Sequence, residues 1–376
     1  MGTEASTIVL PEALRPSDGR FGCGPSKVRT EAVRQLADAA PAYLGTSHRR
    51  DGVRGVVHRI RSGMTNLFSL PDGYEVLLGN GGTTAFWDAA TFGLLERRSQ
   101  HLAFGEFSSK FAAAVRGAPH LAEPQVIEAP YGSHPDAVSD PDIDLYALTH
   151  NETSTGVMMP VRRPERAEGI VAVDATSAAG GMPVDPAEFD VYYLAPQKCF
   201  GSEGGLWVAL ASPAAIERVE RISASGRWVP PSLDLAIALD NSRKDQTYNT
   251  PALATLYLLA EQVDWMLGHG GLEWCAARCE ESAAVLYGWA EASVYASPFV
   301  TDPSIRSTTT ATVDLAEAVD AADVNVALRA NGIVDTESYR KLGRNQLRIA
   351  LFPAIEPDDV ALLTKAIDHV VERLSD

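Results

Sequence analysis

Cysteine is scarce in this chain and forms no recognisable pattern. The 376 residues include only Cys23, Cys199, Cys275 and Cys279, and no two of them form a C-x-x-C pair. This distribution excludes a disulfide framework and offers no tetrahedral set of metal ligands. We therefore expect reduced thiols, a cytoplasmic protein and no metal site.

Positive charge is also in short supply. The chain has 32 lysines and arginines against 49 aspartates and glutamates, so its net charge is −17. Such a chain is repelled by nucleic-acid backbones and by anionic membrane surfaces. We expect no nucleic acid and no membrane among its partners, and an anionic substrate would require a local cluster of positive groups.

Long apolar runs are absent as well. No segment reaches the ~18 consecutive apolar residues of a membrane-spanning helix. The N-terminal stretch MGTEASTIVLPEALRP lacks a basic region followed by an apolar core. The sequence thus predicts neither secretion nor insertion into a membrane.

What the sequence does contain is an alternation of short apolar runs with longer amphipathic stretches. Strands are predicted at Glu75–Leu78, His101–Phe104, Asp144–Leu148, Gly169–Val173, Val191–Leu194 and Leu206–Leu210. Residues 85–95, soon after the first strand, have a helical pattern. This alternation is typical of an α/β domain with a mostly parallel sheet.

The pattern changes beyond Pro251. A long helical stretch covers about 252–289, residues 308–315, 324–331 and 345–351 indicate a smaller α+β unit, and 358–374 form a closing helix. At about 150 residues per domain, the length predicts two or three domains. We predict a large domain over residues 21–269 and a small domain built from residues 1–20 and 270–376.

The most informative single residue is Lys198. It lies in the segment LAPQKCFGSEGGLW, between an apolar strand and a Gly-rich turn that leads into a second apolar strand. This context would hold the lysine at the end of a sheet, where burial lowers its pKa as a Schiff-base nucleophile requires. Taken alone, a turn lysine bonded to nearby carbonyl groups explains the segment at least as well.

Two further features favour a functional role for this lysine. Asp174 ends the apolar strand IVAVD, at the position that faces the ligand crevice in open α/β sheets. The Gly-rich segment GNGGTT at residues 79–84 can bind a phosphate through its backbone N–H groups, although it matches neither G-x-G-x-x-G nor a P-loop. Pyridoxal phosphate needs a lysine for its aldehyde, an acid for its ring nitrogen and such a turn. The combination predicts pyridoxal 5'-phosphate as the cofactor.

With these residues the sequence resembles the phosphoserine aminotransferases, a family of fold-type I pyridoxal phosphate enzymes. The motifs that carry the resemblance are Gly24-Pro25, Ser47-His48-Arg49, Gly81-Gly82, Asn151-Glu152-Thr153, Asp174, Gln197-Lys198 and Asn249-Thr250-Pro251. They extend over about Phe21 to Leu351. The order of Ser-His-Arg, Gln-Lys and Asn-Thr-Pro is fairly specific, whereas an aspartate followed by a lysine would indicate only the superfamily.

The resemblance implies a fold and a reaction. The fold is α/β, a fold-type I transferase with a large, mostly parallel sheet domain and a smaller C-terminal α+β domain. The reaction is reversible amino transfer between L-glutamate and 3-phosphohydroxypyruvate, which gives O-phospho-L-serine and 2-oxoglutarate in serine biosynthesis. Whether 4-phosphohydroxythreonine, used in pyridoxine biosynthesis, is also a substrate stays open.

The resemblance also implies roles around the cofactor ring. Lys198 would bond to the cofactor aldehyde and later move the proton between the α-carbon of the substrate and the cofactor. Asp174 would keep the ring nitrogen protonated. Phe107 would stack on the ring, and Thr153 would hydrogen-bond near the phenolic oxygen.

For the cofactor phosphate, the resemblance implies contacts from both subunits of a homodimer. Gly82, Thr83 and Gln197 would bind it from one subunit. Asn249 and Thr250 would reach it from the partner subunit. The active site would therefore be shared between the two chains.

On the substrate side, the resemblance implies that Arg348 clamps the α-carboxylate. His48 and Arg49 would hold the distal phosphate or carboxylate. The sequence departs from the family pattern where further basic residues are usual, because threonines follow the glycines and Lys341-Leu342 precede Arg348. Our hypothesis is that one of Arg50, Lys341 and Arg344 supplies the missing charge.

Three alternatives remain at this point. The chain could carry out another fold-type I reaction, as a serine–glyoxylate type transaminase or a cysteine desulfurase. It could be an NAD-dependent oxidoreductase, although G-x-G-x-x-G with an acid about 20 residues on is absent. It could also be a catalytically inactive binding module, although Lys198, Asp174 and Arg348 are all retained.

Overall fold

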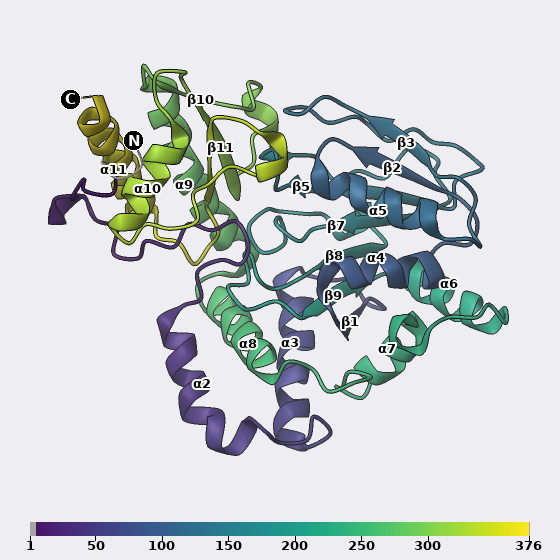
Figure 1. The fold of residues 1–376 in the computed structure, drawn as a ribbon. Helices are drawn as coiled ribbons and strands as arrows, with labels where there is room; N and C mark the ends of the chain where they lie inside the picture. The colour runs from purple at the N-terminus through teal and green to yellow at the C-terminus, as the bar shows by residue number, and fades with distance from the viewer. Residues whose placement is uncertain (1–4, 376) are drawn as a thin grey trace.

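A seven-stranded sheet lies at the centre of the computed structural model, which describes residues 5–375 (Figure 1). Its strands lie in the order β1 (Glu75–Asn80), β9 (Leu206–Ala211), β8 (Val191–Leu194), β7 (Ile170–Asp174), β4 (Leu145–Thr149), β2 (Ser99–Ala103) and β3 (Gln125–Glu128). Strand β9 runs antiparallel to both its neighbours, and the other neighbouring pairs are parallel. The prediction of an α/β domain with a mostly parallel sheet is confirmed.

Helices cover both faces of this sheet. One face packs against α4 (Gly82–Gly93), α5 (Glu106–Gly117), α6 (Pro213–Ala224) and α7 (Leu235–Ser242), and the other against α3 (Asp51–Leu67) and α8 (Leu253–Gly268). Helix α2 (Thr30–Tyr43) lies outside α8. Because side chains alternate along a strand, Val76 and Leu78 enter one core while Leu77 enters the other. Burial on both faces explains why these strands are almost uninterrupted apolar runs.

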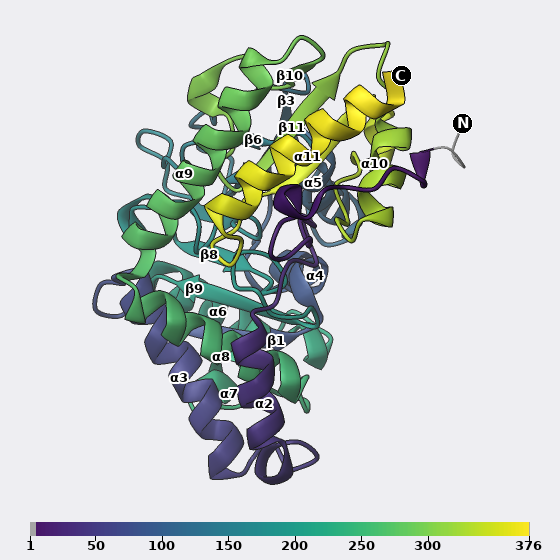
Figure 2. The same cartoon turned by 90° about the vertical axis from the view of Figure 1, so that its left-hand side faces the viewer.

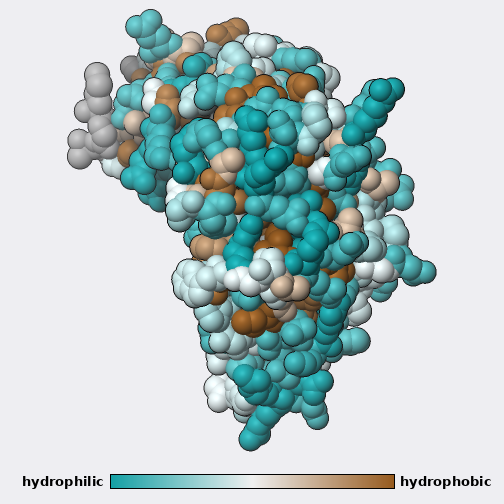
Figure 3. Space-filling view, turned by 90° about the vertical axis from the view of Figure 1, so that its right-hand side faces the viewer, coloured by the Kyte–Doolittle hydropathy of each residue, from teal (hydrophilic) through white to brown (hydrophobic). Residues whose placement is uncertain are grey.

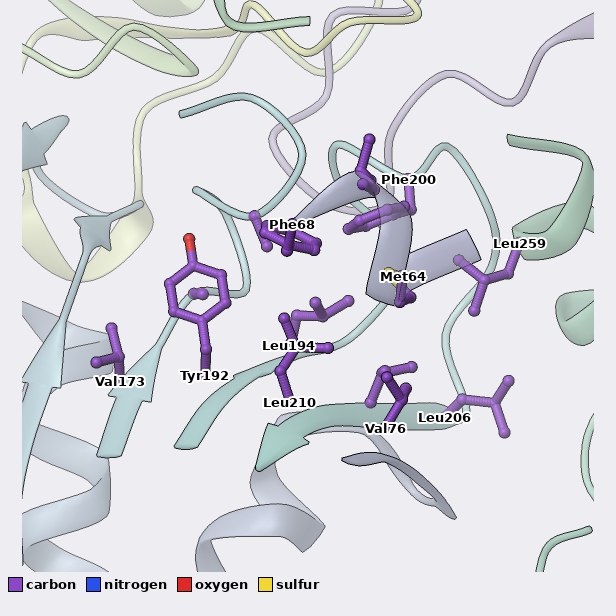
Figure 4. Close-up of a cluster of buried hydrophobic side chains, with 14 of the residues drawn as sticks. Met64, Phe68, Val76, Val173, Tyr192, Leu194, Phe200, Leu206, Leu210 and Leu259 are labelled. Carbon is purple, nitrogen blue, oxygen red and sulfur yellow. The ribbon is translucent and has the colours of Figure 1, made fainter. Parts of the chain in front are cut away.

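The core on the α3 and α8 side joins residues that are far apart in the sequence. Figure 4 shows Met64 of α3 and Leu259 of α8 near the strand residues Val76, Tyr192 and Leu194. The side chains of Met64, Tyr192 and Leu259 are completely buried. This core fixes the strands whose carboxyl ends carry the candidate site.

A second body of structure follows in the chain. The strands β10 (Ala296–Pro298), β11 (Thr310–Leu315) and β12 (Gln346–Ala350) form an antiparallel sheet covered by α9 (Gly271–Ala292), α10 (Ala321–Ala330) and α11 (Pro357–Ser375). Leu10 and Phe21 join the same core, and α11 packs beside α9 and α10 in this body (Figures 1 and 2). The boundaries at 1–20, 21–269 and 270–376 stay a prediction, and residues 1–4 and 376 lie outside the described residues.

The long helical stretch expected over 252–289 consists of two helices. Helix α8 ends at Gly268 and α9 begins at Gly271. Gly270 and Gly271 have φ values of 118° and 71°, which belong to the left-handed region that glycine adopts without steric cost. The chain therefore turns between the two helices, and α9 continues towards the second sheet (Figure 2).

The remaining short elements complete the description. They are the hairpin of β5 (Asn151–Glu152) and β6 (Val157–Met158), and the 3-10 helices at Glu12–Leu14, Pro186–Glu188, Pro231–Leu233, Pro303–Ile305 and Arg340–Leu342. The face turned to the viewer in Figure 3 is mainly hydrophilic, with apolar residues showing in smaller areas. Across residues 5–375, no helix combines the length and the apolar character that crossing a membrane requires.

Candidate active site

A cavity of about 310 Å³ opens at the carboxyl ends of the parallel strands. Its walls include Thr149 at the end of β4, Asp174 at the end of β7 and Lys198 in the segment after β8. Arg348 of β12 comes from the second sheet. The cavity thus lies between the two bodies of structure, at the sheet edge where open α/β folds bind ligands.

Lys198 is buried, and its ammonium group faces the cavity. Its Nζ donates a hydrogen bond of 2.7 Å to Oγ1 of Thr153, and Thr153 in turn donates to Oγ of Ser177. Burial lowers the pKa of Lys198 to about 8, although the nearby Asp174 carboxylate opposes this shift. A lysine with this pKa has a neutral amine in roughly a tenth of the molecules at pH 7, far more than a lysine with the ordinary pKa, and the neutral amine is the form that a nucleophile requires.

Gly24 explains how the lysine side chain can lie where it does. A Cβ atom at position 24 would lie 2.9 Å from Cε of Lys198, and the residue has a φ of 125°. Only glycine satisfies both the close approach and this backbone conformation without strain.

Asp174 is the buried acid of the site. It is 6% exposed and its Oδ1 accepts a hydrogen bond of 3.0 Å from the backbone N–H of Thr176. Burial raises its pKa, while the hydrogen bonds from Thr176 and the charge of Lys198 oppose the rise. A buried carboxylate held in this way is suited to a cationic partner inside the cavity.

The Gly-rich turn forms an anion cradle. Gly81 and Gly82 have φ values of 110° and 77°, and α4 begins at Gly82 with its free N–H groups at the cavity. Thr83 Oγ1 lies 2.7 Å from Thr176 Oγ1. Gln197 also lines the cavity, and its buried Oε1 has no hydrogen-bond partner among the described residues. A helix N-terminus with adjacent hydroxyl and amide groups is a binding site for phosphate.

Phe107 lies at the start of α5, within the cavity wall. The Nζ of Lys198 is 5.0 Å from the centre of its ring, and the ring of Tyr339 is 5.7 Å away. An aromatic face next to the lysine can stack on a flat cofactor ring. This is the position that the resemblance assigns to the stacking residue.

Glu152 positions this aromatic residue, a role that the sequence analysis missed. The Glu152 side chain is fully buried, and its carboxylate accepts hydrogen bonds from the backbone N–H groups of Phe107 at 3.3 Å and Ser108 at 2.8 Å. It therefore caps the N-terminus of α5, where a negative charge is favourable. Since Thr153 bonds to Lys198, neighbouring residues of one short hairpin align the aromatic ring and the lysine.

Arg348 reaches the cavity from β12. Its Nη1 donates a hydrogen bond of 3.4 Å to the backbone carbonyl of Thr153, and its guanidinium carbon lies 5.3 Å from the centre of the Tyr339 ring. The Nε of Arg348 is buried and has no partner among the described residues. A guanidinium with an unused donor beside Lys198 can bind a carboxylate in two-point fashion.

Four of the predicted site residues lie elsewhere in this chain. Thr250 Oγ1 is 3.2 Å from Nδ1 of His48, Asn249 accepts a hydrogen bond from Asn80 through its carbonyl, and Arg49 donates to Gln246. His48, Arg49, Asn249 and Thr250 are not among the residues that line the cavity. One chain therefore does not bring them into the cavity of Lys198, and of the four only His48 and Thr250 form a hydrogen bond with each other among the described residues.

Two of the three residues proposed to supply a missing positive charge already form ion pairs. Lys341 forms an ion pair of 2.5 Å with Glu106, and Arg344 is paired with Asp314. The cavity wall contains a different basic residue, Lys110, which the sequence analysis did not single out. It lies on the helix face of Phe107, and no motif marks it in the sequence.

The cysteines do not favour a desulfurase. Cys23 lines the cavity, but its side chain is buried and burial raises its pKa. Cys199, Cys275 and Cys279 are buried as well, and burial raises the pKa of each. A cysteine that attacks a substrate needs an accessible thiolate, which these environments oppose.

Comparisons with known proteins give a consistent result. The family model Aminotransferase class-V matches residues 24–336. The phosphoserine aminotransferases of Rhodococcus jostii (strain RHA1) and Rhodococcus opacus (strain B4) are each 60% identical over 370 residues, which cover 98% of this chain and 99% of each relative.

Solved structures give the same picture for the fold. A phosphoserine aminotransferase from Cytophaga hutchinsonii superposes with a TM-score of 0.86 at 27% identity, and the match covers 93% of this chain and 99% of that chain. The pyridoxamine-pyruvate aminotransferase from Mesorhizobium loti superposes with a TM-score of 0.82 at 20% identity, covering 98% of this chain and 95% of that chain. The second likeness concerns the fold alone.

Proposed function

Because the chain belongs to the class-V aminotransferases and, among them, to the phosphoserine aminotransferases, we propose that it transfers an amino group reversibly between L-glutamate and 3-phosphohydroxypyruvate. The products are 2-oxoglutarate and O-phospho-L-serine, which places the reaction in serine biosynthesis. This membership confirms the predicted fold-type I transferase fold and the predicted pyridoxal phosphate-dependent aminotransferase activity.

The residues of the cavity fit pyridoxal 5'-phosphate. The anion cradle at Gly81 and Gly82 and the side-chain amide N–H groups of Gln197, which lines the cavity, match its phosphate, and the buried Asp174 matches its cationic ring nitrogen. When bound, this cofactor supplies an aldehyde that takes up the amino group and a ring that stabilises the electron pair left on the α-carbon. We assign the phosphate to Gly82, Thr83 and Gln197, the ring face to Phe107 and the phenolic oxygen to Thr153.

The chain's own groups then perform the proton transfer. Arg348 binds the α-carboxylate of the amino acid and so orients its α-hydrogen towards Lys198. Lys198, with its pKa lowered to about 8, would accept that proton as general base and, as general acid, would return it to the carbon that the cofactor's aldehyde supplies. Asp174 holds the proton on the ring nitrogen throughout.

A single observation carries this proposal, namely that Lys198, Asp174 and Arg348 line one cavity. The test is a visible absorbance titration of the purified protein with O-phospho-L-serine and, in parallel, with L-serine. We expect the cofactor band to bleach at much lower concentrations of phosphoserine. Equal responses to both amino acids would contradict the substrate assignment, and a protein that shows no band after addition of pyridoxal phosphate would contradict the cofactor site.

We propose further that the active site is shared between the subunits of a homodimer. His48, Arg49, Asn249 and Thr250 do not line the cavity of their own chain, although His48 and Thr250 contact each other, and this supports a role at the cavity of a second copy. There, Asn249 and Thr250 would contact the cofactor phosphate, and His48 and Arg49 the distal acid of the substrate. We also propose that the protein is cytoplasmic and that it takes part in pyridoxine biosynthesis.

Mixed dimers test this arrangement. We expect Lys198→Ala and the double variant His48→Ala/Arg49→Ala to be inactive separately. After denaturation and refolding together in equal amounts, a shared site predicts recovery of about a quarter of the wild-type activity, because half of the dimers are mixed and each has one complete site. Refolded Lys198→Ala alone is the control. Failure of the mixture to gain activity, while mixed dimers are detected by mass, would contradict a shared site.

A further inference from the structure

We infer that Lys110 also binds the distal acidic group of the substrate, from within its own chain and beside the His48 and Arg49 that we assign to the second copy, and so contributes to the preference for amino acids with an acid at both ends. This inference rests on the proposed function, because it takes the amino acid to lie between Lys198 and Arg348. It assigns a role to a residue for which neither the sequence motifs nor the resemblance gives one.

The position of Lys110 supports the inference. Lys110 lies one helical turn after Phe107 in α5, so the two side chains share a helix face. Its Nζ is 4.8 Å from the centre of the Phe107 ring, and the residue lines the cavity. The ammonium group is thus held over the ring of Phe107, in the wall of the cavity.

The distribution of charge in the cavity points to the same residue. Among the residues that line it, the cations are Lys110, Lys198 and Arg348, and the anion is Asp174. Lys198 and Arg348 have tasks in the proposed reaction, and Asp174 is the residue that we assign to the ring nitrogen of the cofactor. Lys110 is therefore the lining cation of this chain that is left to bind a second acidic group of the substrate, alongside His48 and Arg49 from the second copy.

Glu106 holds Lys110 at the cavity without neutralising it. Its Oε1 lies 2.5 Å from Nζ of Lys341 and 3.6 Å from Nζ of Lys110, so one carboxylate faces two ammonium groups. Glu106 carries one negative charge against the two ammonium groups, so the group of three side chains keeps a net positive charge. The side chain of Lys110 is 42% exposed and keeps the freedom to turn towards an anion.

The two ends of the substrate would then meet two different kinds of cation. Arg348 lies against Tyr339 and presents a planar fork that suits a carboxylate. Lys110 lies against Phe107, whose ring contacts Tyr339, and presents a point charge that suits a phosphate. An amino acid without a distal acid would use Arg348 alone.

The test compares substrates in the holoenzyme. We expect Lys110→Met to lower kcat/KM for O-phospho-L-serine about 10- to 100-fold, as expected for the loss of one charge-assisted hydrogen bond, mainly through KM. For L-serine, kcat/KM should change by less than about twofold, because serine has no group for Lys110 to bind. Lys110→Arg, which retains the charge, should keep most of the preference, and Lys365→Met in α11 is the matched control.

The outcomes separate this inference from the proposed function. A wild-type enzyme that does not prefer phosphoserine over serine would contradict the proposed function. A wild-type preference that is unchanged in Lys110→Met would overturn the inference alone and leave the distal acid to His48 and Arg49. An equal loss for both substrates would also overturn it, because Lys110 would then support the site in general. The dissociation constant for O-phospho-L-serine, measured by the absorbance titration, should rise in Lys110→Met by about the same factor as KM.

Discussion

Replacement of Lys198 by alanine is expected to lower amino transfer by at least about 10⁴-fold, the upper end of what a positioned general base contributes. The variant loses both the amine that bonds to the cofactor and the group that moves the proton. The fold should survive, because Lys198 lines a cavity and is not part of the closely packed hydrophobic core. Single-turnover kinetics with O-phospho-L-serine, followed by absorbance, measure the effect.

A matched variant distinguishes the reactive amine from its positive charge. Lys198→Arg keeps a cation that can donate a hydrogen bond to Thr153 and should be almost as inactive as the alanine variant. Addition of a small primary amine should restore part of the activity of Lys198→Ala but not of Lys198→Arg, whose side chain fills the space. Activity of Lys198→Ala above about 1% of wild type would show that another group transfers the proton.

The sequence was sufficient to predict the residues that follow the strands. Asp174 ends one apolar run, and Lys198 lies four residues after the end of another. The carboxyl ends of parallel strands meet at one edge of the sheet. Their proximity thus follows from the fold class, before any side-chain contact is known. Strand β3 was not predicted, because Gln125–Glu128 is only partly buried and lacks the apolar run that marks the inner strands.

Contacts between distant segments could not be predicted in this way. Arg348 meets Thr153 across a separation of 195 residues, and that contact depends on how the second sheet docks onto the first. Glu152 belongs to a motif that the sequence analysis quoted, but the motif does not show its role. That role follows from the position of α5, because the Glu152 carboxylate accepts hydrogen bonds from the first N–H groups of this helix. Lys110 lies in an ordinary helix, and only the cavity distinguishes it from other surface lysines. A single sequence cannot show such long-range contacts.

The substitution Asp174→Asn is expected to lower kcat by about 10²- to 10³-fold, which is the effect of removing one preorganised charge from an active site. The asparagine side chain has nearly the same shape and can still accept the hydrogen bond from Thr176, so the geometry is preserved. It carries no charge, however, and cannot hold the proton on the ring nitrogen. Measurement of kcat at saturating phosphoserine, with cofactor content determined from absorbance, separates slow chemistry from loss of cofactor.

The same substitution should also change the titration of Lys198. Burial lowers the pKa of Lys198 to about 8, and the charge of Asp174 is the largest influence that opposes this shift. Removing that charge should lower the pKa further, since the ammonium form loses a favourable partner. In the cofactor-free protein, the pH dependence of amine acylation at Lys198, read by mass spectrometry, should therefore move to lower pH. Asp174→Glu keeps the charge and should show neither the lower pKa nor the full loss of kcat. If Asp174→Asn kept more than about a tenth of the wild-type kcat, the carboxylate would not be the group that holds the ring proton.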